Sequence, residues 1–365
     1  MKIIDLFSGC GGLSLGFIQR GHKIVKAVEI DASIANTYKM NHPEVNMIVG
    51  DIKTLDGAGI FKQGEADLII GGPPCQGFSM AGARIRNGFI DDPRNYLFKH
   101  YFNVVKTVRP KAFIMENVKG ILTMQNGKIF SEIISSFSNS NLLDGYAYNI
   151  HYKIVKAVEL GIPQKRERVI VIGTLKNGYD FDFLWDKTIL DIKTKLPTFF
   201  YPVTVRDAIE GLEKPNDMGI VKKNKAKSDY EKHLEGALPV LYNHIQTKHS
   251  AKALERMKQI KVGENHEILD EKIKSVHSGA YGRLDWDSPA PTITTRFDTP
   301  AGGRFIHPVE NRTLTPREAA RIQSFPDDFI FYGSKSSVCK QIGNAVPPKI
   351  SYFLSCFIEN ILKGD

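Results

Sequence analysis

The stretch KIIDLFSGCGGLSLGFIQR, residues 2–20, indicates the fold class of this 365-residue chain. Residues 2–7 form a short apolar run typical of a buried strand, and residues 13–20 have the apolar content of a helix. The glycine-rich turn between them predicts backbone N–H groups that point toward a ligand. A strand, a glycine turn and a helix in this order favour a nucleotide-binding α/β sheet.

The following strand narrows the kind of ligand. Residues 23–28 predict a strand that ends in Glu29, which lies 20 residues after Gly9, where an acidic group meets a ribose hydroxyl. The dinucleotide fingerprint requires a third glycine at position 14, but Ser14 stands there. An adenosine-containing ligand without a pyrophosphate therefore fits the spacing better.

A second stretch, DLIIGGPPCQGFS at residues 67–79, carries a cysteine at the end of a predicted strand. Two glycines and two prolines stop the apolar run of residues 67–70 and make a stiff turn. In open α/β sheets, ligands and chemistry sit at such strand ends. A buried structural role is usual for a lone thiol and stays open for Cys75, although a core cysteine needs no rigid turn.

Residues 5–12 and 72–76 resemble the first and fourth motifs of the cytosine-5 DNA methyltransferases. The later motifs follow in the family's order at residues 116–118, 164–168, 317–326 and 341–348. The resemblance implies a Rossmann-like, mostly parallel α/β sheet flanked by helices, with a smaller irregular domain for target recognition. Residues 1–187 alternate strand and helix signals, and the pattern then fades. We expect residues 1–187 plus 336–365 to form the catalytic, cofactor-binding domain and residues 188–335 the small domain.

The resemblance assigns the nucleophile to Cys75. Cytosine C5 is a poor nucleophile, and attack of a thiolate on C6 makes C5 reactive toward a methyl group. Glu116, at the end of the strand predicted for residues 112–115, would supply a proton near N3 if burial keeps it protonated. Arg166 and Arg168 would stabilise charge on the base O2 and the phosphate, and Arg168 is the closer match to the family. Composition alone makes residues 165–168 an ordinary surface charge run, and no residue is an obvious base for the C5 proton.

The methyl donor that the resemblance implies is S-adenosyl-L-methionine. Phe7 would contact the adenine or simply pack in the core, Glu29 would hold the ribose, and Asp51 would accept from the adenine amino group. Asn344 would return to the same pocket or be a plain turn residue. The full expected cofactor set is Phe7, Gly9, Gly11, Gly12, Glu29, Ile30, Asp51, Ile52, Pro74, Asn344 and Val346.

Double-stranded DNA is the expected partner, and its target cytosine must be flipped out of the duplex to be reached. The net charge of +9 suits phosphate contacts. Residues 76–94, rich in glycine, would close over the base or form only a flexible surface loop. The expected DNA contacts are Gln76, Ser79, Arg84, Arg86, Arg94, Thr292 and Arg296.

Composition limits the other classes of protein. Cys10, Cys75, Cys339 and Cys356 have no Cys-x-x-Cys spacing, so no metal site is expected, and free thiols fit a bacterial cytoplasm. No apolar run approaches a membrane span. A tRNA methyltransferase of the same family would carry a Cys-Phe-Thr signature, and no cysteine lies between Cys75 and Cys339. A non-catalytic DNA-binding homologue is disfavoured by the retained catalytic residues. The compact length is similar to monomeric bacterial modification enzymes that work beside a separate restriction endonuclease.

Overall fold

The computed structural model describes residues 1–74, 97–271, 273, 275 and 277–363. Spatial clustering divides the chain into two compact units. The first comprises Met1–Lys156, Glu167–Lys195 and Ile350–Asp365, and the second comprises Ala157–Arg166 and Leu196–Lys349. Residues 157–166 and 336–349 thus cluster with the second unit, whereas the sequence-based division placed them in the catalytic domain. The side chains of Arg166 and Lys349 explain this grouping, because both donate to backbone carbonyl groups of the second unit.

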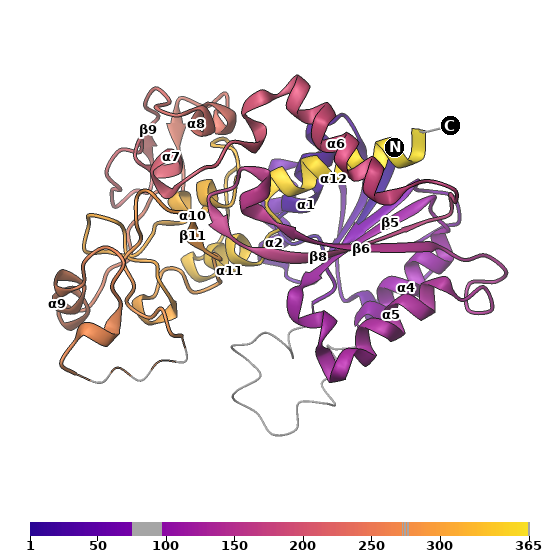
Figure 1. The fold of residues 1–365 in the computed structure, drawn as a ribbon, viewed down its shortest axis with the longest axis horizontal. Helices are drawn as coiled ribbons and strands as arrows, with labels where there is room; N and C mark the ends of the chain where they lie inside the picture. The colour runs from indigo at the N-terminus through magenta and orange to yellow at the C-terminus, as the bar shows by residue number, and fades with distance from the viewer. Residues whose placement is uncertain (75–96, 272, 274, 276, 364–365) are drawn as a thin grey trace. The chain divides into compact units, whose positions relative to one another are not determined.

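A seven-stranded sheet forms the centre of the first unit, with the strand order β3-β2-β1-β4-β5-β8-β6. Adjacent strands are parallel except for β8, which runs antiparallel to both β5 and β6. This arrangement confirms the predicted mostly parallel α/β fold (Figure 1). The strands are β1 (Lys2–Leu6), β2 (Lys23–Glu29), β3 (Asn46–Val49), β4 (Leu68–Gly71), β5 (Ala112–Val118), β6 (Asn149–Lys156) and β8 (Glu167–Thr174).

Helices cover both faces of this sheet (Figure 1). One face carries α4 (Leu97–Val108) and α5 (Lys128–Ser138), whose apolar sides pack with β5 around the rings of Phe113 and Phe137, 4.2 Å apart. The other face carries α1 (Gly12–Gln19) and α12 (Pro348–Lys363). The remaining helices of this unit are α2 (Ala32–Asn41), α3 (Ile52–Leu55) and α6 (Phe181–Lys195), with the 3-10 turns η4 (Lys119–Leu122) and η5 (Met124–Gly127).

The strand order reverses between β1 and β4, which are neighbours at the centre of the sheet. Leu6 at the end of β1 is in register with Gly71 at the end of β4. A Cβ atom on Gly71 would lie 2.4 Å from the carbonyl oxygen of Leu6, so glycine permits the close approach of the two backbones. The glycine turn and the Gly-Pro-Pro turn therefore leave the sheet side by side, at the position where open α/β sheets bind ligands.

The second unit is built from short elements. They are η6 (Ala157–Leu160), β7 (Gln164–Lys165), η7 (Pro197–Phe200), α7 (Val205–Ile209), β9 (Val221–Lys222), α8 (Asp229–Leu234), β10 (Val240–Leu241), α9 (Ala251–Gln259), η8 (His266–Ile268), β11 (Ala290–Pro291), η9 (Pro300–Gly302), α10 (Pro316–Ile322) and α11 (Lys335–Asn344).

Buried ion pairs organise the second unit, since it has few strands to fix its backbone. Thr315 and Glu318 make a capping box at the start of α10, as the sequence predicts. The Glu318 carboxylate also accepts two hydrogen bonds from Arg312, at 2.7 and 2.8 Å. Arg321 of the same helix donates twice to Asp327, both at 2.8 Å. Removing one partner of such a buried pair is strongly destabilising, so α10 anchors the unit.

Membrane insertion finds no support in the helices. Among the described residues, no helix has both the length and the apolar character that crossing a membrane requires.

Candidate functional site

The glycine turn after β1 is held in a conformation that favours glycine. Gly9 and Gly11 have φ angles of +54° and +99°. The Gly9 N–H donates to Glu29 Oε2 at 3.0 Å, and the Asp31 N–H donates to Glu29 Oε1 at 2.9 Å. Burial raises the pKa of Glu29, and these two N–H donors offset part of that effect. The carboxylate at the end of β2 is therefore fixed against the turn, where sequence reasoning placed it.

The residues around this turn differ in how exposed they are. A Cβ atom on Gly9 would meet no atom of the described residues within 4 Å. Ile30, next to Glu29, is 65% exposed and offers an apolar surface for a flat base. Asp51 caps α3 by accepting from the Lys53 N–H at 3.0 Å, which orients its carboxylate at the end of β3.

Other expected cofactor residues lie in less open surroundings. Ile52 is buried in the core of the first unit, and Phe7 packs against that core. Gly12 is buried as the first residue of α1, and Pro74 ends the described segment after β4. In the second unit, Asn344 is exposed at the end of α11 and Val346 is buried.

The turn after β4 is anchored by a residue to which the sequence gave no role. The side-chain amide of Asn117, which is buried in β5, donates to the carbonyl oxygen of Pro73 at 3.0 Å. A Cβ atom on Gly72 would lie 3.2 Å from Glu116 Oε2, so glycine leaves room for this carboxylate. Glu116 and the Pro-Pro turn therefore face each other across neighbouring strands.

Glu116 and Arg168 form an ion pair between β5 and β8. The distance between Arg168 Nε and Glu116 Oε1 is 3.0 Å, and the two side chains are 15% and 12% exposed. The N–H is not aligned for a hydrogen bond, so Oε1 is buried without a hydrogen-bond partner among the described residues. Arg168 also donates to the carbonyl oxygen of Glu167 at 2.8 Å. Oε1 therefore has Arg168 as its electrostatic partner and keeps unused hydrogen-bonding capacity.

Arg166 has different contacts from Arg168. Its side chain is 1% exposed and lies in the second unit. It donates to the carbonyl oxygens of Ala345 at 2.9 Å, Gly343 at 3.3 Å and Ile293 at 3.5 Å. Arg166 thus joins its own backbone segment to those at residues 293 and 343–345, whereas Arg168 pairs with the Glu116 carboxylate.

Several expected site residues lie outside the described residues: Cys75, Gln76, Ser79, Arg84, Arg86 and Arg94. The other three cysteines are described, and burial raises the pKa of Cys10 and Cys339 to about 12 and raises that of Cys356. These thiols stay protonated at neutral pH and are poor nucleophiles. Within the described part of the chain, no cluster of His, Cys, Asp and Glu side chains could hold a metal ion.

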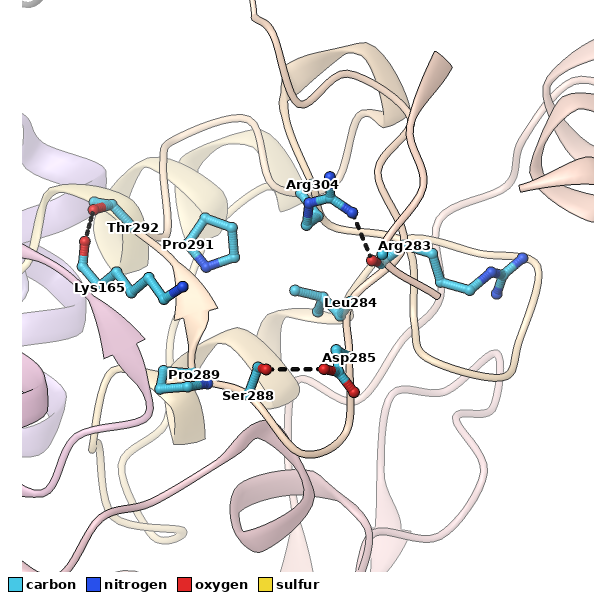
Figure 2. A pocket seen from close by; sticks show the side chains of 10 residues that line it. Lys165, Arg283, Leu284, Asp285, Ser288, Pro289, Pro291, Thr292 and Arg304 are labelled. Atoms are coloured by element: carbon cyan, nitrogen blue, oxygen red, sulfur yellow. Dashed lines mark hydrogen bonds between the residues drawn. The ribbon is translucent and has the colours of Figure 1, made fainter. Parts of the chain in front are cut away.

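A hollow of about 510 Å³ lies in the second unit, beside the two short strands β7 and β11 (Figure 2). Figure 2 shows the Lys165 side chain extending across it, while the Thr292 hydroxyl donates to the Lys165 carbonyl oxygen at 2.8 Å. Arg304 donates to the Arg283 carbonyl oxygen at 3.2 Å. The lining residues are Lys165, Gly263, Arg283, Leu284, Asp285, Ser288, Pro289, Pro291, Thr292 and Arg304.

This hollow brings together residues from distant parts of the chain. Thr292 is an expected DNA contact, and Arg296 of the same segment is exposed. The sequence gave no signal for Arg304, which belongs to no predicted motif. Lys165 lies in the motif of residues 164–168, but the sequence assigned it no role of its own.

The family model for C-5 cytosine-specific DNA methylases matches residues 1–359. The chain is 34% identical to the Type II methyltransferase M1.HphI of Haemophilus parahaemolyticus, over 100% of this chain and 87% of that protein. It is 35% identical to the Type II methyltransferase M.DdeI of Desulfomicrobium norvegicum, over 99% and 90%. A solved prophage-encoded candidate DNA modification methyltransferase from E. coli has a TM-score of 0.75 and 31% identity, with coverage of 100% and 99%.

Proposed function

The chain belongs to the C-5 cytosine-specific DNA methylases, and we propose that it methylates a flipped-out cytosine of a specific duplex site through a bond between Cys75 and cytosine C6. The observation that carries this proposal is Glu116, whose buried Oε1 makes no hydrogen bond within the described residues and lies beside the turn that leads to Cys75. This oxygen is suited to face a polar ring atom of the base.

The first unit supplies the residues that we propose for the methylation reaction. The Cys75 thiolate attacks C6, and the negative charge that develops in the ring is met by a proton delivered to N3 from Glu116. Arg168 holds the Glu116 side chain in place and adds positive charge near the base. After methyl transfer, a bound water takes the C5 proton, and the electrons of that C–H bond re-form the C5–C6 double bond as Cys75 leaves as a thiolate. N3 returns its proton to Glu116, which restores the aromatic ring and the starting state of the enzyme.

S-adenosyl-L-methionine supplies an electrophilic methyl group when it is bound. We assign the ribose to Glu29, the adenine to the region of Ile30 and Asp51, and the close backbone approach to Gly9 and Gly11. Gly12, Ile52 and Phe7 support this site from the core side. Asn344 and Val346 keep their predicted role in cofactor binding as part of this proposal.

The second unit would contact the DNA. Lys165 and Arg304 line the hollow in Figure 2 and present positive charge beside Thr292, which suits contacts to the sugar–phosphate backbone. Arg166 is then a positioning residue, because its guanidinium fixes the backbone at Ile293, next to Thr292. The residues expected to contact DNA in the segment 76–94 remain part of the proposal.

The biological setting follows from the relatives. M1.HphI and M.DdeI are bacterial Type II methyltransferases, so we propose that this chain protects DNA in the cytoplasm of a bacterium, as a monomer beside a separate restriction endonuclease. A tRNA substrate has no specific observation in its favour.

Whole-genome bisulfite sequencing tests the proposal after expression in a bacterial host that lacks cytosine methylation. Protected cytosines within one short motif support the function and give the recognition site. The matched variant Cys75→Ala should leave no protected cytosines while the purified protein still binds DNA and cofactor. Protection by this variant would refute the covalent mechanism, and a soluble wild-type protein that protects no cytosine would refute the DNA substrate.

A further inference from the structure

A buried chain of polar side chains lies beneath the glycine turn of the first unit. The Ser14 hydroxyl donates to Asp5 Oδ2 at 2.6 Å, and the Ser14 and Tyr38 hydroxyl oxygens are 2.7 Å apart. All three side chains are fully buried. They come from β1, α1 and α2, so the chain links the three elements that surround the turn.

The same chain determines where the turn can lie. A Cβ atom on Gly11 would be 3.0 Å from Tyr38 Cδ2 and 3.1 Å from His42 Cδ2, so the turn rests directly on these two rings. The rings pack edge to face, with centroids 5.0 Å apart. Because the Tyr38 hydroxyl is held by Ser14, the position of the ring, and with it the position of Gly11, depends on this hydrogen bond.

Asp5 is the charged end of the chain. Its Oδ2 accepts from Ser14, and its Oδ1 is buried with no hydrogen-bond partner within the described residues. Burial raises the pKa of Asp5 to about 7, and the negative charge of Glu29 adds to this effect. When Asp5 is ionised, Ser14 donates to it and Tyr38 donates to Ser14, which makes a charge-assisted chain.

The other titratable groups around Asp5 differ from it in behaviour. Burial raises the pKa values of Tyr38 and Tyr101 well above their ordinary range and that of Cys10 to about 12, while it lowers that of His42 to about 4. These four groups stay neutral around neutral pH. Glu29 is the neighbouring carboxylate whose charge acts on Asp5, and burial raises its pKa as well.

We propose that Asp5, Ser14 and Tyr38 position the glycine turn for the cofactor, and that Asp5 releases a proton to solvent when a cofactor with a sulfonium cation binds. The inference rests on the proposed function, since it takes S-adenosyl-L-methionine as the ligand. A positive ligand charge favours an ionised carboxylate, and by linkage an ionised carboxylate favours the positive ligand. The demethylated product, S-adenosyl-L-homocysteine, has a neutral sulfur and otherwise the same charged groups. The ratio of the two affinities therefore isolates the effect of the sulfonium charge.

Isothermal titration calorimetry of both ligands, from about pH 6 to about pH 8.5, tests this inference without relying on turnover. As pH rises through about 7, Asp5 ionises and the affinity for S-adenosyl-L-methionine relative to S-adenosyl-L-homocysteine should rise by roughly threefold to tenfold. Repeating the titrations in two buffers of different ionisation enthalpy counts the released proton.

Three variants separate positioning from simple structural support. Asp5→Asn should make the affinity ratio independent of pH. Tyr38→Phe and Ser14→Ala should weaken both ligands severalfold, and Tyr38→Phe should move the midpoint of the pH profile upward, because the carboxylate loses part of its hydrogen-bond support. DNA binding without cofactor and the far-ultraviolet circular dichroism spectrum serve as folding controls.

The outcomes distinguish this inference from the proposed function. A ratio that is flat with pH in the wild-type protein overturns the inference alone, and so does an unchanged pH profile in Asp5→Asn, which would assign the titration to a group other than Asp5. If Asp5→Asn does not fold, Tyr38→Phe decides, and wild-type affinities and midpoint in that variant overturn the inference. Failure of both ligands to bind wild-type protein at any pH would refute the cofactor site itself and, with it, this inference.

Discussion

Replacing Glu116 by glutamine should slow methyl transfer far more than it destabilises the protein. The amide keeps the size of the side chain and an acceptor oxygen near Arg168 Nε, 3.0 Å away in the wild-type protein. Because that pair is about one-eighth exposed, we expect a loss of about 1–3 kcal/mol in the free energy of unfolding. A positioned proton donor contributes about 10²–10⁴-fold to a rate, which corresponds to about 3–5 kcal/mol of the activation barrier. The rate loss should therefore exceed the stability loss.

The assay is transfer of a labelled methyl group from S-adenosyl-L-methionine to duplex DNA under single-turnover conditions, alongside the cofactor Kd. The cofactor Kd should stay within about threefold of wild type, because Glu116 lies on β5 and the glycine turn follows β1. Glu167→Gln is the matched control, since Glu167 forms an exposed ion pair with Lys119 at 2.9 Å. This pair is exposed to solvent, which screens it, so the variant should methylate DNA at the wild-type rate. Equal rates for Glu116→Gln and wild type would refute the proton-donor role, and equal losses in the two variants would indicate a general electrostatic effect.

Three further predictions concern packing, buried charge and DNA binding. Gly16→Ala places a Cβ atom 2.1 Å from the backbone of α12, so in urea unfolding it should lower the free energy of unfolding by more than the roughly 1–3 kcal/mol of ordinary overpacking. In the control Gly57→Ala, the Cβ atom meets no atom of the described residues within 4 Å, and the free energy of unfolding should change by less than about 1 kcal/mol. Equal effects of the two substitutions would contradict the packing argument. Arg312→Leu leaves the Glu318 carboxylate buried without its arginine partner and should lower the free energy of unfolding by about 3–5 kcal/mol. Burial opposes ionisation of Glu318, but Arg312 outweighs burial and lowers the pKa of Glu318 to about 2, so in the wild-type protein this stabilisation is present above about pH 4.5 and is lost as the pH falls toward 2. An acid-unfolding profile that does not shift in the variant would contradict this prediction. Lys165→Gln should weaken DNA binding at every sequence alike and reduce the slope of log Kd against log salt by about one, and an unchanged slope would remove Lys165 from the phosphate contacts.

Local patterns in the sequence were sufficient for the central strands of the sheet and for the turns that follow them. The apolar runs of β1 and β4 and the glycine and proline turns after them predict strands that end at a ligand site, and both strands are central in the sheet. The capping box at Thr315 is likewise a local signal, because its partners lie three residues apart. Such features depend on residues that are close together along the chain, so they can be predicted from the sequence.

Contacts between distant residues could not be read in this way. Arg166 and Arg168 are two positions apart, and the resemblance gave both a role in stabilising charge, with Arg168 the closer match to the family. In the structure, Arg166 binds three backbone carbonyl groups of the second unit, whereas Arg168 pairs with Glu116. Asn117 was quoted as part of a motif, but its bond to the Pro73 carbonyl depends on strand pairing between β4 and β5.

The sequence by itself determined the fold class and the family, because both rest on short-range pattern and ordered motifs. Tertiary structure alone decided which polar groups share a buried environment. Asp5 reads as one residue of an apolar strand, and only packing of α1 and α2 against β1 places it in line with Ser14 and Tyr38. The energy of a charge or a hydrogen bond depends on its surroundings in space, and those surroundings are set by chain segments far apart in sequence.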